Sequence, residues 1–460
     1  MTTSPVAAGR LLMHLTANGA YSSGEEDLLV IQRGDGPYVF DTEGRRYVDA
    51  LSSLYCAQIG YSYAQEISEA ASSQMRTLPF STIWSAAHPT AIELADKLCE
   101  LAPGSMNGVF FTSGGAESVE SAWKIARQYH VLRGEPERTK AIARRDAYHG
   151  LTLGALSFTA DPALKDVFGP PAVPVRHVSN TGRFRRGDLG DDAAFVSLLV
   201  RELEEAIREE GPTTIGMLIA EPVQNRGGCI TPPEGYWQAL RNLADRYGFL
   251  LVADEVITAF GRLGQWFGAE RYDAQPDIVT TAKGLTSAYA PMGAVLVSDR
   301  VAGMLRAPGV VLNHGFTFAG HPLCAAVALK SIEILERDKL FANVSGLEPH
   351  LSARMHALKR HRIVGDVRGS GFFFAVELVP DGGEGRFTTR QREVLIRRML
   401  PDTLRGRGVL ARVYDRAEPL LQIAPPLISD RALLDTIVDV IDEVLAEGSA
   451  LLEGDLGTFS

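Results

Sequence analysis

The sequence predicts an α/β protein with two parts: a large domain in which helices cover a mostly parallel sheet, and a smaller α+β domain built from both chain termini. Two observations support this class. From about residue 89 to the 320s, short strands that are apolar along their whole length alternate with amphipathic helical segments. That pattern is typical of parallel sheets buried on both faces. After about Lys330 the pattern changes to mixed helices and strands, which the N-terminal strands could complete.

Local signals place the elements in chain order. Residues 1–59 are expected to form an N-terminal arm and part of the small domain, with a hairpin turn at Asp41 to Gly44. Residues 60–329 are the expected large domain, where a strand runs through Gly114-Gly115 into an amphipathic helix. Four further buried strands are expected in TIGMLIAEPV, GFLLVADEV, DIVTTAK and MGAVLVSD. Residues 330–460 are the expected C-terminal small domain, which closes with an amphipathic helix.

Composition excludes several classes of protein. The 460 residues are 45% hydrophobic and 22% charged, ordinary values for a globular chain of two or three domains. The net charge of −10 argues against nonspecific binding to nucleic-acid phosphates. No run approaches the ~18 consecutive apolar residues of a membrane-spanning helix. The four cysteines are scattered without a C-x-x-C pair, which predicts a cytoplasmic protein, and the histidines lack metal-ligand spacing, so no metal site is expected.

Four candidate groups fall where the buried strands end, the edge at which ligands of such sheets gather. Gly114-Gly115 leave free N–H groups at a helix start, which suits a phosphate or simply a tight turn. Asp254 follows four apolar residues and needs a partner, either a cationic ring nitrogen or a structural ion pair. Lys283 is either a desolvated amine nucleophile or a lysine that reaches solvent. Tyr148 could stack on a planar cofactor or pack in the core.

One ligand requires all four groups. Pyridoxal 5′-phosphate (PLP) needs N–H donors for its phosphate, an aromatic face for its ring, an anion for its pyridinium nitrogen and an amine for its aldehyde. The glycine segment lacks both the G-x-G-x-x-G spacing and the Walker A lysine, which disfavours a dinucleotide or a nucleoside triphosphate. The residues alone therefore predict a PLP site.

A paired motif resembles that of the class III (omega) aminotransferases, PLP-dependent enzymes of fold type I: FLLVADEVITAFGRLGQWFG followed by PDIVTTAKGLTSAYAPMGA. The resemblance extends over nearly the whole chain, from GPYVFDTEGRRYVDA to QIAPPLIS. It implies that Lys283 bonds covalently to the cofactor aldehyde, that Asp254 pairs with the ring nitrogen and that Tyr148 stacks on the ring.

The same resemblance implies the remaining contacts. Further cofactor-binding residues are expected at Gly115, Ala116, His149, Glu221, Val256 and Thr317. Because Thr317 is expected to reach the phosphate of the neighbouring subunit, the active site should form at the interface of a homodimer, or of a dimer of dimers. The substrate pocket is expected to include Tyr55, Trp84 and Arg412, the last as a mobile arginine that receives a substrate carboxylate. Ala116 stands where the family usually has serine, so one hydroxyl contact to phosphate should be missing.

The expected activity is a ping-pong transamination from an amine or omega-amino-acid donor to a keto acid or aldehyde acceptor. PLP-dependent aminomutases, racemases and decarboxylases of the same fold share the lysine, the aspartate and the tyrosine, so they are the alternative. A noncatalytic regulator built on this fold would carry an added basic domain, which the sequence does not show. The natural donor and acceptor depend on the shape of the pocket, which the sequence does not place.

Overall fold

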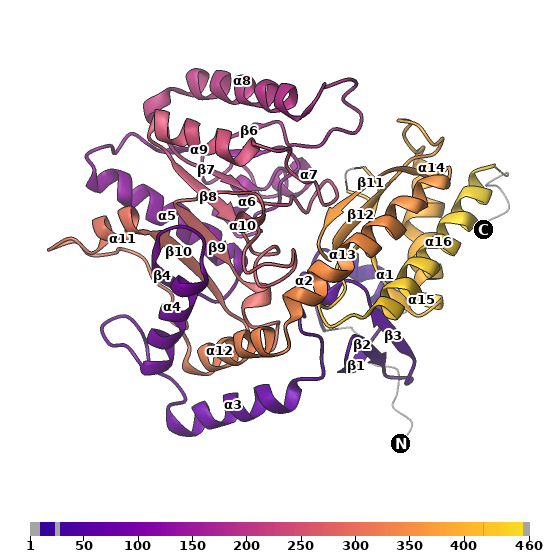
Figure 1. Ribbon diagram of the computed structural model, residues 1–460, viewed down its shortest axis with the longest axis horizontal. Helices are drawn as coiled ribbons and strands as arrows, with labels where there is room; N and C mark the ends of the chain where they lie inside the picture. The colour runs from indigo at the N-terminus through magenta and orange to yellow at the C-terminus, as the bar shows by residue number, and fades with distance from the viewer. Residues whose placement is uncertain (1–9, 24–27, 417, 454–460) are drawn as a thin grey trace.

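The computed structural model describes residues 10–23, 28–416 and 418–453, and a seven-stranded sheet lies at its centre (Figure 1). The strand order is β4-β10-β9-β8-β7-β5-β6. These strands are β4 (Met106–Thr112), β5 (Lys140–Arg144), β6 (Val175–Val178), β7 (Ile215–Ala220), β8 (Leu250–Asp254), β9 (Ile278–Thr281) and β10 (Gly293–Ser298). Strand β10 is antiparallel to both of its neighbours, and the other pairs are parallel. The mostly parallel sheet predicted from the apolar strands is confirmed.

Helices pack on both faces of this sheet because successive strand residues point to opposite sides. Met217 and Ile219 of β7 share one apolar cluster with Val119 of α5 (Gly115–Leu132). Leu218 of β7 belongs to the other cluster, together with Trp237 of α9 (Tyr236–Tyr247). The remaining helical elements of this part of the chain are α3 (Ala64–Thr77), α4 (Pro89–Leu101), α6 (Leu153–Phe158), α7 (Pro162–Lys165), α8 (Asp192–Glu210), η1 (Pro212–Thr214), α10 (Gly268–Arg271), η2 (Lys283–Leu285), α11 (Asp299–Leu305) and α12 (Pro322–Arg337).

A second part, on the right in Figure 1, combines segments from both ends of the chain. One sheet has the order β1 (Ile31–Asp35), β2 (Tyr38–Asp41), β3 (Arg46–Asp49) and β13 (Val409–Leu410). The pairing of β13 with β3 joins the C-terminal segment to the N-terminal strands. A further sheet has the order β11 (Val364–Ser370), β12 (Phe373–Leu378), β15 (Leu420–Ile423) and β14 (Arg412–Tyr414). The helical elements of this second part are α1 (Asn18–Ser23), α2 (Ser52–Tyr55), α13 (Leu340–Ala357), η3 (Leu358–Arg360), α14 (Thr389–Gln391), η4 (Arg392–Met399), α15 (Leu400–Gly406) and α16 (Arg431–Glu453).

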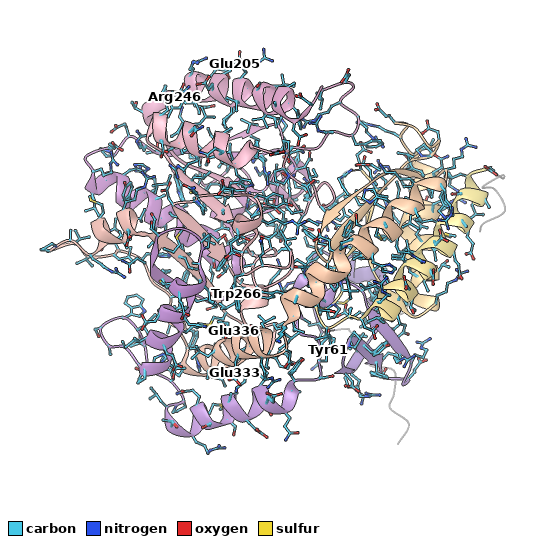
Figure 2. All side chains as sticks on the ribbon, viewed as in Figure 1. Tyr61, Glu205, Arg246, Trp266, Glu333 and Glu336 are labelled. Atoms are coloured by element: carbon cyan, nitrogen blue, oxygen red, sulfur yellow. The ribbon has the colours of Figure 1, made fainter. Side chains whose placement is uncertain are left out.

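The division into residues 1–59, 60–329 and 330–460 stays a prediction, and α12 runs across the last of these boundaries. Figure 2 shows side chains over the outer surface of both parts; Glu205 on α8 and Glu333 on α12, both in the large part, are exposed. Within the described residues, no helix combines the length and apolarity that crossing a membrane requires. The same part of the chain holds no cluster of three or more His, Cys, Asp or Glu side chains suited to a metal ion.

Candidate active site

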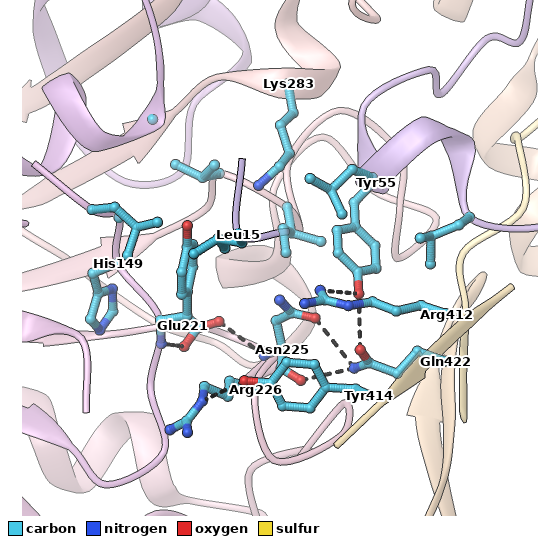
Figure 3. A pocket seen from close by; sticks show the side chains of 18 of the residues that line it. Leu15, Tyr55, His149, Glu221, Asn225, Arg226, Lys283, Arg412, Tyr414 and Gln422 are labelled. Atoms are coloured by element: carbon cyan, nitrogen blue, oxygen red, sulfur yellow. Dashed lines mark hydrogen bonds between the residues drawn. The ribbon is translucent and has the colours of Figure 1, made fainter. Parts of the chain in front are cut away.

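A cavity of about 1010 Å³ opens at the carboxyl edge of the central sheet, where β14 and β15 of the second part face it. Asp254 ends β8, Lys283 follows β9, and Glu221 follows β7, so three neighbouring strands deliver these groups to one place. Ten of the twelve predicted site residues line this cavity: Tyr55, Gly115, Ala116, Tyr148, His149, Glu221, Asp254, Val256, Lys283 and Arg412. Figure 3 shows Lys283 and Arg412 reaching into it from different sides.

Lys283 presents an unpaired amine to the cavity. Its backbone has a φ of +36°, in the region that is strained for a residue with a side chain. Its Nζ makes no hydrogen bond with any residue that the structure describes. Burial lowers the pKa of Lys283, and the positive charge of Arg412 lowers it further, whereas Asp254 and Glu221 act in the opposite direction. The net shift is toward the neutral amine, the form that acts as nucleophile and base.

The Asp254 carboxylate is buried and held by three donors. Nδ1 of His149 lies 2.6 Å from Oδ2 of Asp254, while Thr280 Oγ1 donates to Oδ1 at 2.9 Å and the Val256 N–H donates to it at 3.2 Å. Only 4% of Asp254 is exposed. Donors to both oxygens fix the orientation of this carboxyl group toward the cavity.

Glu221 lies on the opposite side of the cavity from Lys283 (Figure 3). Its carboxylate accepts hydrogen bonds from the backbone N–H groups of Tyr148 at 3.3 Å and Asn225 at 2.9 Å. Burial raises the pKa of Glu221, and the nearby Asp254 raises it further. The Tyr148 side chain is half-buried and borders the same cavity, so one face of its ring is available to a planar group.

A tight cradle lies where β4 runs into α5. Gly115 begins α5, so the first N–H groups of an 18-residue helix point out of its N-terminus without intrahelical partners. A Cβ atom on Gly115 would approach Cγ1 of Val256 to 2.8 Å, and one on Gly150 would approach Cβ of Ala116 to 2.7 Å. Because the cradle has room only for glycine at both positions, the backbone N–H groups can approach an anion closely.

Tyr55 and Arg412 form the wall contributed by the second part. Arg412 Nη1 donates to the Tyr55 hydroxyl at 3.2 Å, and that hydroxyl donates to Gln422 Oε1 at 2.9 Å. Burial raises the pKa of Tyr55 to about 12, so the phenol is neutral. Among the described residues, no carboxylate lies within ion-pair distance of Arg412. Its guanidinium is therefore available to an anionic ligand.

Two predicted site residues lie outside the cavity of this chain. The Trp84 side chain is 68% exposed, and its Nε1 donates to the backbone carbonyl of Phe316 at 3.2 Å. Thr317 follows in the same exposed segment. The structure of one chain thus places Trp84 and Thr317 beside each other and away from Lys283.

Several lining residues were not predicted. Arg226, Tyr414, Asn225, Gln422, Leu15 and Arg416 all border the cavity. They belong to loops and short strands with no periodic pattern, and most depend on contacts between segments far apart in the sequence. The position of Arg226 two residues after the strand-end segment AEPVQ was the one available signal.

Comparisons with known proteins agree with this architecture. The model of the aminotransferase class III family matches residues 20–445. The Mycobacterium tuberculosis protein named "Probable aminotransferase Rv3329" is 44% identical over 91% of this chain and 90% of its own length. The putrescine–pyruvate aminotransferase of Pseudomonas aeruginosa is 36% identical over 93% and 92%.

Solved structures of transaminases also resemble this chain over nearly its whole length. A thermostable (S)-enantioselective omega-transaminase from Thermomicrobium roseum superposes with a TM-score of 0.91 at 41% identity, covering 96% of this chain and 97% of the other. The Pseudomonas jessenii omega transaminase in complex with PMP has a TM-score of 0.91 at 33% identity, covering 98% and 99%. Fold and site thus define an enzyme of the transaminase class. Within that class, the chain belongs to the class III aminotransferase family.

Proposed function

We propose that this aminotransferase uses PLP to move an amino group from an amine or omega-amino acid to a keto acid or aldehyde by a ping-pong mechanism. The observation that carries the proposal is the half-buried, unpaired Lys283 amine, which shares one cavity with the Asp254 carboxyl group and with Arg412. The name of the Pseudomonas aeruginosa relative, putrescine–pyruvate aminotransferase, supports an amine donor and a keto acid acceptor.

The residues present fit the cofactor. The N–H groups of Gly115 and Ala116 would bind its phosphate in the cradle that a Cβ atom would fill. Tyr148 and Val256 would contact the ring, Asp254, held by His149, would pair with the ring nitrogen, and Glu221 would border the ring. Lys283 would bond to the aldehyde. When bound, PLP supplies a ring that withdraws electrons from the donor carbon.

Each protein group then has a defined task. Lys283 Nζ would remove the proton from the donor carbon and, in the half-reaction with the acceptor, would deliver a proton to the carbonyl carbon of the acceptor. Asp254, oriented by three hydrogen-bond donors, would pair with the protonated ring nitrogen. Arg412 binds the carboxylate of a keto acid through two parallel hydrogen bonds. The apolar residues Leu15, Ile257 and Leu420 at the cavity exclude water from these steps.

The proposal includes a homodimer with shared active sites. Large apolar side chains are exposed next to Thr317: Phe80 is 41% exposed, Trp84 68% and Phe318 64%. Phe80 and Phe318 contact each other edge to face, with ring centroids 5.9 Å apart. An apolar cluster of this kind is typical of a surface that a protein partner covers. Covering it with a second copy would bring Thr317 and Trp84 toward the other subunit's cavity. The four cysteines are free, which supports the proposed cytoplasmic location.

Product stoichiometry tests the proposed function. The protein, supplied with PLP, is incubated with putrescine or a simple primary amine and with pyruvate, and alanine is measured against amine consumed. We expect one alanine per amine, no consumption of amine without a keto acid, and no turnover by the Lys283→Ala variant. The matched control is Lys330→Ala, which removes a lysine paired with Glu333 on a surface helix. Consumption of amine without any acceptor would favour an aminomutase, racemase or decarboxylase.

A further inference from the structure

A buried ion pair holds the hydroxyl of Tyr414 at the edge of the cavity. Arg226 Nε donates to the Tyr414 hydroxyl at 3.0 Å. The same guanidinium donates to the Ala160 carbonyl at 2.6 Å and pairs with Asp161 at 3.0 Å. The side chains of Arg226 and Asp161 are only 6% and 2% exposed. Because each nitrogen of the buried Arg226 guanidinium has a partner in Tyr414, Ala160 or Asp161, the donor that holds Tyr414 has little freedom to move.

The ring of Tyr414 in turn contacts Arg412. The guanidinium carbon of Arg412 lies 4.7 Å from the centroid of the Tyr414 ring, a cation–π distance. Arg412 also donates to the hydroxyl of Tyr55, and that tyrosine is anchored by Gln422 (Figure 3). Two phenols, each fixed by a separate partner, therefore define where the guanidinium of Arg412 rests.

We infer that Tyr414, held by Arg226, is a positioning residue that keeps Arg412 directed at the carboxylate of the acceptor. An arginine side chain loses much rotamer freedom when it binds a ligand. A cation that is already ordered before the ligand arrives loses less of this freedom on binding, so the ligand binds more tightly. The inference rests on the proposed function, in which Arg412 receives the carboxylate of a keto acid.

Comparing an acceptor substrate that has a carboxylate with one that lacks it distinguishes the positioning role of Tyr414 from a general role in supporting the fold. We expect Tyr414→Leu, which removes the ring, to raise the ratio of the KM for pyruvate to the KM for hexanal by about 3- to 10-fold, the range of a partly desolvated cation–π contact. Tyr414→Phe keeps the ring and loses only the bond to Arg226, so we expect about a 2-fold rise. A residue that merely supports the fold would change both KM values together.

A double-mutant cycle tests whether Tyr414 acts through Arg412. In the Arg412→Ala background, Tyr414→Leu should change the KM ratio by less than about 1.5-fold, because residues that act through one another are not additive. An equal effect in both backgrounds would overturn the inference, and so would an unchanged ratio in Tyr414→Leu alone. The matched control is Tyr129→Phe, which removes a hydroxyl that accepts from Arg133 at 3.0 Å far from the cavity; the KM ratio should stay unchanged.

Binding of propionate gives a readout that does not depend on turnover, because propionate has a carboxylate but no carbonyl to react. Calorimetric titration of the PLP-loaded protein should show a Kd about 3- to 10-fold higher in Tyr414→Leu than in the native chain, whereas an equal Kd would contradict the positioning role. Failure of the proposed function has a different signature: the native protein would transfer no amino group to pyruvate or hexanal, while propionate binding would still depend on Tyr414.

Discussion

Nδ1 of His149 lies 2.6 Å from Oδ2 of Asp254, and both side chains are buried. The second ring nitrogen of His149, Nε2, is buried without a hydrogen-bond partner among the described residues. With a proton on Nδ1, His149 donates to Oδ2 of Asp254 and fixes the orientation of that carboxyl group.

Replacing His149, which donates a hydrogen bond to Asp254, should weaken the proposed pairing of Asp254 with the cofactor ring. In His149→Leu, Oδ2 of Asp254 loses its partner while Thr280 still donates to Oδ1. We expect kcat to fall by about 10- to 100-fold, the range of one hydrogen bond to a charged group. In His149→Asn the amide can still donate, so the loss should be smaller. Steady-state kinetics with saturating PLP measures both, and a native kcat in His149→Leu would contradict the role.

The depressed pKa of Lys283 makes a prediction about pH. An amine attacks an aldehyde only in its neutral form, and burial lowers the pKa of Lys283 from its ordinary value of 10.5. As pH rises, the neutral fraction in the folded, cofactor-free protein should reach half of its maximum below pH 10.5. The rate of PLP uptake, followed by absorbance, should therefore be half-maximal at a pH below 10.5. A midpoint at or above pH 10.5 would show that the pKa of the amine is not lowered.

Replacing Ala116 by serine tests whether an added hydroxyl at this position tightens the binding of PLP. It is the second residue of α5, beside the cradle in which the N–H groups are expected to bind phosphate. Ala116→Ser adds one hydroxyl donor, so the dissociation constant of PLP should fall by about 3- to 10-fold, as expected for an added hydrogen bond to a charged group. Ala116→Val fills similar space without a hydroxyl and should not tighten binding. Equilibrium dialysis compares the three proteins, and equal constants for serine and alanine would place the phosphate elsewhere.

The sequence predicted the candidate site residues that lie at the ends of strands in the central sheet. Asp254 is the last residue of the buried strand β8 and Lys283 follows the buried strand β9, and parallel strands bring such ends to one edge. The wall around Arg412 could not be predicted in the same way. Tyr55 and Gln422 are 367 positions apart in the chain, and no local pattern encodes such a contact.

The backbone conformation of residues Ser52 to Tyr55 could also not be predicted from the sequence. Residues Ser52 to Tyr55 all have positive φ, although none is glycine, and the strained segment is what places the ring of Tyr55 against Arg412. Strain of this kind costs roughly 1–3 kcal/mol per residue and is tolerated because the surrounding structure fixes it. Ser52 Oγ, for example, donates to the Ala424 carbonyl at 2.7 Å.

Arg262 should be essential for the stability of this junction. It is fully buried, and its guanidinium donates to the carbonyls of Phe372 at 3.2 Å and Pro425 at 2.6 Å and to Ser52 Oγ at 3.1 Å. Burial lowers its pKa to about 10, so it remains charged at neutral pH. Arg262→Met leaves buried acceptors unpaired and should cost about 2–4 kcal/mol.

Thermal inactivation measures this loss, since large proteins often unfold irreversibly. The half-life of Arg262→Met at a fixed temperature should be much shorter than that of the native chain. Arg271→Met is the control, because Arg271 makes a partly exposed ion pair with Glu348, a type of contact worth about 0–1 kcal/mol. Equal half-lives for the two variants would refute a special role for Arg262.

Complementation between two defective chains tests whether Thr317 serves the other subunit. A Lys283→Ala chain and a Thr317→Ala chain are co-expressed with different tags, and the mixed dimer is isolated. If Thr317 acts across the interface, one site of the mixed dimer contains both substitutions and the other contains neither. We therefore expect the mixed dimer, at limiting PLP, to recover about half of the native activity, while each parent remains far below that level.

The opposite arrangement gives a different result. If Thr317 serves its own chain, both sites of the mixed dimer carry one defect and no activity is recovered. Phe318→Asp supplies the structural half of the test, because a charge in the exposed apolar cluster should prevent the dimer from forming, as measured by sedimentation velocity. Leu198→Asp, at an apolar position on α8 that is 40% exposed, should leave the dimer intact. A dimer that survives Phe318→Asp and shows no complementation would remove this surface from the active site.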